Sequence, residues 1–304
     1  MTEEYAVSRY EEACELLPGR LRTAALAAGR REKAAAEELR LRLGRPVYLT
    51  LPEGERPLPE TRVARSDLEQ VLDRATEYSR YTASETLRHG YVTARGGFRV
   101  GVCGTALPSG ACNEGVRDVS SLALRIPRVR EGAARPVLPA LLEEGRLLSA
   151  LVLSPPGGGK TTLLRDLVRL VSQGEGLPEP MRVALVDERG ELAAVHRGQP
   201  QLEVGCHTDV LDGCPKALAV PMLLRAMTPQ VIALDEVALP ADVEAVRSAA
   251  NCGVTLLATV HAASREDLMR RSVGRSLLEC GVFRRMVLIR GRGTDRESRV
   301  EALP

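Results

Sequence analysis

A glycine-rich stretch between an apolar strand and a helix constrains the fold of this chain more than any other feature. Residues 150–153 are apolar, and Ser154 is followed by two prolines, three glycines, one lysine and two threonines before a helical pattern begins. Glycines let successive backbone N–H groups turn toward one anion, and a helix N-terminus adds its positive dipole. A lysine then reaches the outer phosphates of a nucleotide, and a hydroxyl binds Mg²⁺. The pattern predicts a phosphate-binding loop whose nucleotide-binding residues are Pro156, Gly157, Gly158, Gly159, Lys160, Thr161 and Thr162.

The lysine of this loop stands out because the chain otherwise uses arginine for its cations. Only three lysines occur, at Lys33, Lys160 and Lys216, and a phosphate-binding loop needs a compact cation. Ser154 stands where the pattern GxxxxGK[ST] begins with glycine. That departure leaves the glycine triplet and the Lys-Thr pair intact. The alternative is a glycine-rich turn with an exposed lysine.

An acidic pair follows an apolar strand downstream of the loop. Residues 231–234 are apolar and run directly into Asp235 and Glu236. We expect Asp235 and Thr161 to be the Mg²⁺ ligands, with Asp235 acting through water, and Glu236 to polarise the attacking water as a general base. An acidic pair is common after buried strands and by itself indicates no function. Its position downstream of a phosphate-binding loop favours a role in metal binding and catalysis.

Two other strand ends carry polar side chains. Residues 183–186 run into Asp187 and Glu188, and residues 256–260 run into His261. Because the carboxyl ends of parallel strands meet at one edge of a sheet, these side chains are expected near the same cleft. Glu188 and His261 are therefore further catalytic candidates, with His261 placed to sense a γ-phosphate by hydrogen bonding. The alternatives are an acidic turn in solvent and a structural histidine.

The pattern of elements predicts an α/β fold with two domains. Residues 1–135 are expected to form a smaller α+β domain, and residues 136–304 a domain with a parallel sheet covered on both faces. In the first, we expect helices within 1–43, a strand at 47–51, a loop at 52–59, a helix at 67–78 capped by Ser66, a helix at 82–89, a hairpin of 91–94 with 98–102, and a strand at 119–126. In the second, we expect strands at 149–153, 182–187, 231–235, 254–260 and 284–290, and helices at 160–173, 215–227, 240–251 and 264–279.

Composition excludes several classes of protein. Hydrophobic residues are 44% and charged residues 27% of the chain, as in ordinary globular proteins. The net charge of +2 and the aromatic content of 3%, with no tryptophan, argue against a nucleic-acid partner that stacks bases. No apolar run is long enough to span a bilayer and the acidic N-terminus lacks a secretory signal, so a cytoplasmic protein is expected.

The motifs together resemble those of the secretion ATPases, the motors of type II and type IV secretion and of pilus assembly. Those proteins carry a Walker A loop, an acidic "Asp box", a Walker B strand with a glutamate and a "His box". The matching segments here are 154–162, 187–191, 223–236 and 249–262. Asp235 departs from the many members that have glycine before the glutamate. Within the family, Asp187-Glu188-Arg189 and Cys214-Pro215-Lys216 resemble a sporulation branch.

This resemblance implies a RecA-like domain that hydrolyses ATP with Mg²⁺. It also implies hexameric rings in which the site lies between an N-terminal domain and the RecA-like domain of an adjacent subunit. A sporulation member would act peripherally at the inner membrane, in the mother-cell cytoplasm, on a channel to the forespore, with membrane proteins as partners. Arg125 and Arg128 are candidates for contacting phosphate across an interface, and the alternative is two solvated arginines at a strand end.

Three other functions compete with an ATPase motor. A RecA-like core also drives nucleic-acid ATPases, which is the main alternative. A GTP switch lacks its guanine-reading element, because no lysine lies in an NKxD pattern. A nucleotide-binding scaffold without turnover is opposed by the presence of Glu236.

Overall fold

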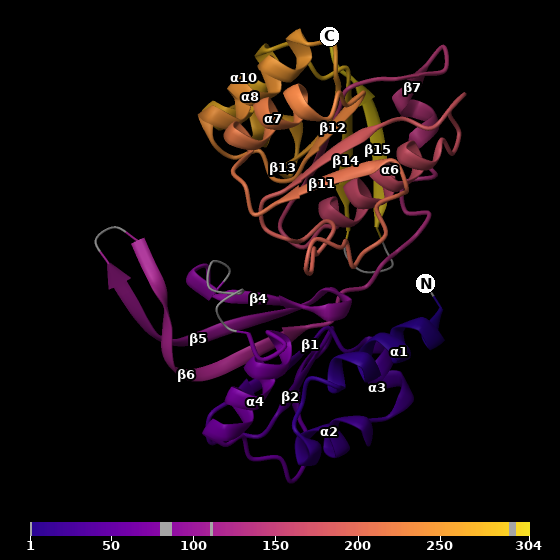
Figure 1. Ribbon diagram of the computed structural model, residues 1–304. Coiled ribbons are helices and arrows are strands. Elements are labelled where there is room, and N and C mark those ends of the chain that lie inside the picture. The colour runs from indigo at the N-terminus through magenta and orange to yellow at the C-terminus, as the bar shows by residue number, and fades with distance from the viewer. Residues whose placement is uncertain (1, 80–86, 110–111, 292–295) are drawn as a thin grey trace. The chain divides into compact units, whose positions relative to one another are not determined.

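The computed structural model describes residues 2–79, 87–109, 112–291 and 296–304 (Figure 1). It contains two compact units. The first comprises the chain up to Val129 together with Ala194–Gln201, and the second comprises Arg130–Ala193 and Leu202–Pro304. The sequence places a single boundary after residue 135 and does not anticipate that a segment from the middle of the second unit belongs to the first.

The first unit is an antiparallel sheet with four described helices. The sheet has the order β3-β2-β1-β6-β5-β4 and every neighbouring pair is antiparallel. The predicted hairpin is confirmed as β4 and β5, joined by a 3₁₀ turn in which Gly96 has a φ of 80°. The elements are α1 (Glu3–Cys14), α2 (Gly19–Leu26), α3 (Arg30–Ala35), β1 (Glu38–Arg42), β2 (Tyr48–Leu51), β3 (Gly54–Pro57), α4 (Arg65–Ala75), β4 (Tyr91–Ala94), η1 (Arg95–Gly97), β5 (Phe98–Ser109) and β6 (Cys112–Arg125).

Three local predictions for this unit are wrong. Residues 38–42 form a strand instead of continuing a helix, because Leu39 and Leu41 alternate into the core. Residues 54–57 form the edge strand β3 instead of a loop. Helix α4 begins after Ala64, whose N–H donates to the Asp67 carboxylate at 2.6 Å, so Asp67 and not Ser66 caps the helix. The helix predicted at 82–89 falls mostly outside the described residues.

The second unit is built on a seven-stranded sheet of order β11-β10-β12-β13-β9-β14-β15. Neighbouring strands are parallel except β14 and β15, which are antiparallel. The elements are η2 (Leu138–Leu141), β7 (Leu142–Glu143), β8 (Arg146–Leu147), β9 (Ala150–Ser154), α6 (Lys160–Gln173), β10 (Val183–Asp187), β11 (Thr208–Asp212), α7 (Lys216–Ala226), β12 (Val231–Leu234), α8 (Pro240–Asn251), β13 (Thr255–His261), α9 (Arg265–Arg270), α10 (Ser272–Glu279), β14 (Arg285–Arg290) and β15 (Glu297–Ala302).

The sheet of the second unit is covered on both faces, as the continuous apolar strands predict. On one face, alternate strand residues such as Leu151, Leu153 and Ile232 form a buried cluster with side chains of α7, α8 and α10, which Figure 1 shows grouped on one side of the sheet. The intervening residues, such as Val152, are equally buried but lie outside that cluster. Helix α6 contributes nothing to the cluster and contacts β9, β10 and β13, so it covers the other face.

The predicted α/β fold is confirmed, with differences in the second unit, among them the short antiparallel pair β7 and β8, which the sequence does not predict. The strands β11 and β15 were not expected, and both lie at the edges of the sheet. The helix predicted at 264–279 is two helices, α9 and α10, which are separated by Arg271 in an extended conformation. No helix among the described residues is long and apolar enough to cross a membrane.

Candidate functional site

The loop predicted to bind phosphate joins β9 to the N-terminus of α6. Gly157 and Gly159 have φ values of 74° and 99°, a left-handed conformation that glycine adopts without strain. A Cβ added at Gly158 would lie 2.4 Å from the Ser154 hydroxyl, so glycine is also required there by close packing. Pro156 and Gly157 are exposed at the tip of the loop. The loop therefore turns tightly and leads into the first turn of α6, where a helix leaves N–H groups that can bind an anion.

Lys160 is buried at the base of this loop, with 5% of its surface exposed. Its Nζ lies 3.3 Å from the carbonyl oxygen of Ser154 and 2.8 Å from Nδ1 of His261. Burial lowers the pKa of Lys160, while the charges of Asp235 and Glu236 oppose that shift. Because an ammonium group only donates, Nδ1 of His261 accepts, and the ring proton of a neutral His261 lies on Nε2.

The first acid after β12 is held by two threonines. Thr161 of α6 donates its hydroxyl to Asp235 Oδ2 at 3.1 Å, and Thr259 of β13 donates to Asp235 Oδ1 at 2.5 Å. The hydroxyl oxygen of Thr259 in turn accepts the N–H of Glu236 at 2.8 Å. The structure thus brings the two predicted Mg²⁺ ligands, Thr161 and Asp235, next to each other. The fully buried Thr259 thus links Asp235 to the backbone of Glu236, a role that the sequence does not predict.

Glu236 lies where the loop, β12 and β13 meet. It has a φ of 50°, a strained conformation for a residue other than glycine, and its side chain is 23% exposed. One carboxylate oxygen lies 2.6 Å from a guanidinium nitrogen of Arg189, and the other lies 3.4 Å from Nε2 of His261. Lys160, His261 and Glu236 thus form a continuous row of polar contacts.

The carboxylate predicted at Glu188 has a different partner. Its Oε2 lies 2.5 Å from Nζ of Lys216, a lysine that is 6% exposed at the start of α7. The preceding Asp187 accepts the backbone N–H groups of Glu191, Leu192 and Ala193 and so holds the turn together. Within this segment, Arg189 is the residue that contacts Glu236, and the sequence did not point to that contact. A basic residue directly after an acidic strand end was the available signal.

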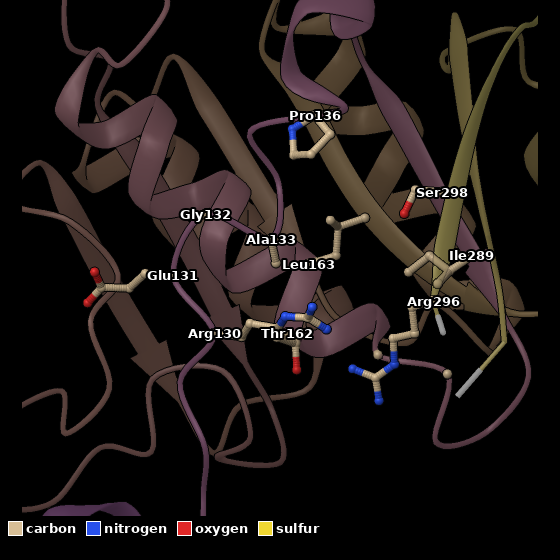
Figure 2. Close-up of a pocket in the computed structure, with 12 residues that line it drawn as sticks. Arg130, Glu131, Gly132, Ala133, Pro136, Thr162, Leu163, Ile289, Arg296 and Ser298 are labelled. Carbon is tan, nitrogen blue, oxygen red and sulfur yellow. The ribbon is translucent and has the colours of Figure 1, made fainter. Parts of the chain in front are cut away.

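A pocket of about 400 Å³ lies beside the loop, within the second unit. Gly158, Gly159 and Thr162 line it on the loop side, and Figure 2 shows Arg130 and Arg296 reaching into the region next to Thr162. Arg296 also donates to the carbonyl oxygen of Gly157 at 3.3 Å. The two arginines come from the start of the second unit and from the position just before β15, too far apart in sequence to be predicted as neighbours.

The residues present suit Mg²⁺ bound to nucleotide phosphates. Their donors are a threonine hydroxyl and an aspartate carboxylate, the hard oxygen ligands that this ion takes alongside water and phosphate. Among the residues that the structure describes, no group of three or more His, Cys, Asp and Glu side chains is placed to hold a metal ion. The donor set therefore fits an ion that enters with a nucleotide and not one held by protein ligands alone.

The two arginines proposed for an interface have partners within the first unit. Arg125 donates to Glu38 at 2.9 Å and remains 60% exposed. Arg128 donates to the carbonyl oxygen of Ala36 at 2.6 Å, and burial lowers its pKa. Arg125 is the better placed of the two to reach another molecule.

Comparison with known proteins identifies the family. The model of the family described as "Sporulation stage III, protein AA" matches residues 7–300. The chain belongs to the sporulation stage III protein AA family. It is 38% identical to the stage III sporulation protein AA of Bacillus subtilis (strain 168) over 290 residues, which are 95% of this chain and 94% of that protein.

Solved structures of similar fold support the architecture of this family member. The chain is similar to the X-ray structure of the Legionella pneumophila ATPase DotB, with a TM-score of 0.58, 17% identity, and coverage of 88% of this chain and 76% of that one. It is also similar to the pilus retraction motor PilT with bound ADP, with a TM-score of 0.59, 16% identity, and coverage of 88% and 80%. The predicted RecA-like fold of the secretion ATPases is confirmed.

Proposed function

We propose that this protein is a Mg²⁺-dependent ATPase, a motor that acts on a membrane assembly during sporulation. The observation that carries the proposal is the convergence of Lys160, Thr161, Asp235, Glu236 and His261 at one edge of the sheet, beside a pocket of about 400 Å³. These residues come from α6, β13 and the end of β12. A lysine, a threonine hydroxyl and two carboxylates are the residue types that phosphoryl transfer uses, which supports the proposal.

The phosphates of ATP would lie against the loop, with the N–H groups of the first turn of α6 and the helix dipole facing them. The ammonium group of Lys160 would then bind outer phosphate oxygens in place of His261. The pocket next to Thr162 is large enough for a nucleoside, and Arg130 and Arg296 would contact its ribose or α-phosphate.

Mg²⁺, when bound by Thr161 and through water by Asp235, would neutralise charge on the phosphates. Glu236 would accept a proton from the attacking water, because its carboxylate lies beside the loop and is partly open to solvent. His261 would donate from a ring nitrogen to a γ-phosphate oxygen.

The setting of this activity follows from the family. Membership of a sporulation family and similarity to an ATPase and a pilus retraction motor support a protein that assembles into a hexameric ring and acts on membrane proteins. We propose that it works at the inner membrane face of the mother cell and energises a channel toward the forespore. Hydrolysis would lie at the boundary of adjacent subunits.

Steady-state release of phosphate from ATP tests the enzymatic part of this proposal. Lys160→Ala should lose turnover and Lys33→Ala, a lysine of the first unit paired with Glu11, should keep it. Removal of Mg²⁺ by a chelator should stop the wild-type reaction. Turnover that survives Lys160→Ala would show that the activity belongs to another site.

A further inference from the structure

The segment from Asp187 to Gln201 joins the acidic strand end of the second unit to the first unit. We propose that this segment couples Glu236 to the first unit, with Arg189 at one end and a hairpin, Ala194–Gln201, at the other. The catalytic role of Glu236 rests on the proposed function, but the coupling itself can be measured without any nucleotide.

At the site end, Arg189 is held by a tight turn. The N–H of Gly190 donates to the carbonyl oxygen of Asp187 at 3.2 Å, and Gly190 has a φ of 64°. This turn presents the Arg189 guanidinium to Glu236 at 2.6 Å. This contact occupies a carboxylate oxygen of Glu236 that the attacking water would otherwise approach, so the proposed hydrolysis needs the contact to open.

The stretch between Arg189 and the hairpin is held in place by side-chain hydrogen bonds to its backbone. The Asp187 carboxylate, which is 1% exposed, accepts the N–H groups of Glu191 and Ala193, each at 2.8 Å. Arg165 of α6 donates to the carbonyl oxygens of Glu191 and Leu192 at 2.7 and 2.5 Å. Residues 191–193 are thus held on the second unit directly before the hairpin, and this held stretch is the path along which we expect a displacement of the hairpin to reach Arg189.

The hairpin is closed at its neck and at its tip. Across the neck, the N–H of Leu202 donates to the carbonyl oxygen of Ala193 at 3.1 Å. Near the tip, His196 and Gln199 exchange two backbone hydrogen bonds of 2.9 and 3.0 Å. This closed loop belongs to the first unit, although the chain on either side of it belongs to the second.

Three side chains of the hairpin hold it in the first unit. Gln201 accepts the N–H of Gly96 at 2.7 Å. The ring of His196 contacts Glu77 at 3.1 Å, and Arg197 pairs with the other oxygen of Glu77 at 2.5 Å. These contacts are polar and partly exposed, so they can open and close without unfolding either core.

Hydrogen exchange in the nucleotide-free protein tests the coupling. Arg189→Ala should raise the exchange rate of the Gly96 amide about threefold or more, because the hairpin loses its support at the far end. Amides of β1, in the core of the first unit, should keep their rates. Arg189→Lys should restore the wild-type rate, and Arg247→Ala, an exposed arginine of α8, serves as the matched control.

Two results would overturn the proposal. One is a Gly96 rate in Arg189→Ala equal to that in Arg247→Ala. The other is a rise shared by the amides of β1, which would mean general destabilisation.

A second readout uses the doubly substituted His196→Ala/Gln201→Ala protein, in which basal kcat for ATP should rise with unchanged KM. If the wild-type protein proves inactive, the proposed function fails, while the exchange experiment still decides the coupling.

Discussion

At the scale of single residues, Lys160 is the side chain whose surroundings say most about the site. Its ammonium group is buried, lies against a histidine ring nitrogen and a carbonyl oxygen, and has Asp235 and Glu236 nearby. Among the residues that the structure describes, no carboxylate forms an ion pair with this buried cation, which leaves its charge available to an anion. Burial is the largest cause of its lowered pKa, and the two acids oppose it.

This lowered pKa gives a prediction about protons. A lysine whose pKa is lower in the folded protein binds fewer protons than in the unfolded chain, so folding stability rises with pH up to the ordinary value of 10.5. Bound phosphate favours the charged amine and raises the pKa. We therefore expect nucleotide binding to take up protons as the pH approaches that window. Calorimetry in two buffers of different ionisation enthalpy measures this uptake, and identical heats in both buffers at every pH would refute it.

Ser154 and Gly158 give a prediction about the shape of the loop. A Cβ at position 158 would lie 2.4 Å from the Ser154 hydroxyl and 2.7 Å from its Cβ, so Gly158→Ala should destabilise the protein by about 1–3 kcal/mol. Ser154→Gly in the same chain removes both contacts and leaves one of 3.0 Å to the carbonyl oxygen of Pro155. Urea denaturation should show most of the stability regained. A double variant no more stable than Gly158→Ala would mean that the strain lies elsewhere.

At the scale of elements, strands of the second unit that are buried on both faces were predictable and edge strands were not. The strands β9, β10, β12, β13 and β14 are continuous apolar runs, and each lies within one or two residues of its predicted bounds. The edge strands β11 and β15 read TDVLD and ESRVEA. Polar residues are tolerated there because one side of an edge strand has no neighbouring strand, so neither carries a strong pattern.

The same reasoning explains the missed strand β1. Its sequence, ELRLR, continues a run rich in alanine, glutamate and arginine, all residues common in helices. Only the burial of Leu39 and Leu41 beside β6 and β2 selects the strand. Long-range pairing of this kind cannot be predicted from local propensity. For the same reason, the sequence does not predict that Arg189 pairs with Glu236 or that Lys216 pairs with Glu188.

Leucines of the β1 region allow a direct test. Leu41→Ala should lower the free energy of unfolding by about 2–5 kcal/mol, because the side chain is fully buried in the first unit. Leu43→Ala, at a side chain that is 41% exposed just beyond the strand, should cost less than about 1 kcal/mol. Urea denaturation followed by circular dichroism compares the two. Equal losses would contradict a strand whose core face carries Leu41.

At the scale of the whole molecule, the chain runs from the first unit to the second, back for one hairpin and out again. Such threading connects the two units at three places, while each keeps its own sheet and core. The proposed motor requires that a change in one unit affects the other.

Light scattering of the wild-type protein should show a rise in mass when ATP and Mg²⁺ are added, and Lys160→Ala should remain at its nucleotide-free mass.

Hydrolysis of ATP by wild type and Glu236→Gln, measured beside ATP binding, tests the central claim most directly. The substitution keeps the size of the side chain and removes the carboxylate that would accept the proton of water. We predict turnover in the wild type, and in Glu236→Gln a turnover lower by about 100-fold or more with ATP still bound. Glu244→Gln, at an exposed residue of α8, should behave as the wild type. Equal turnover in all three proteins would contradict the assignment of Glu236 as the general base.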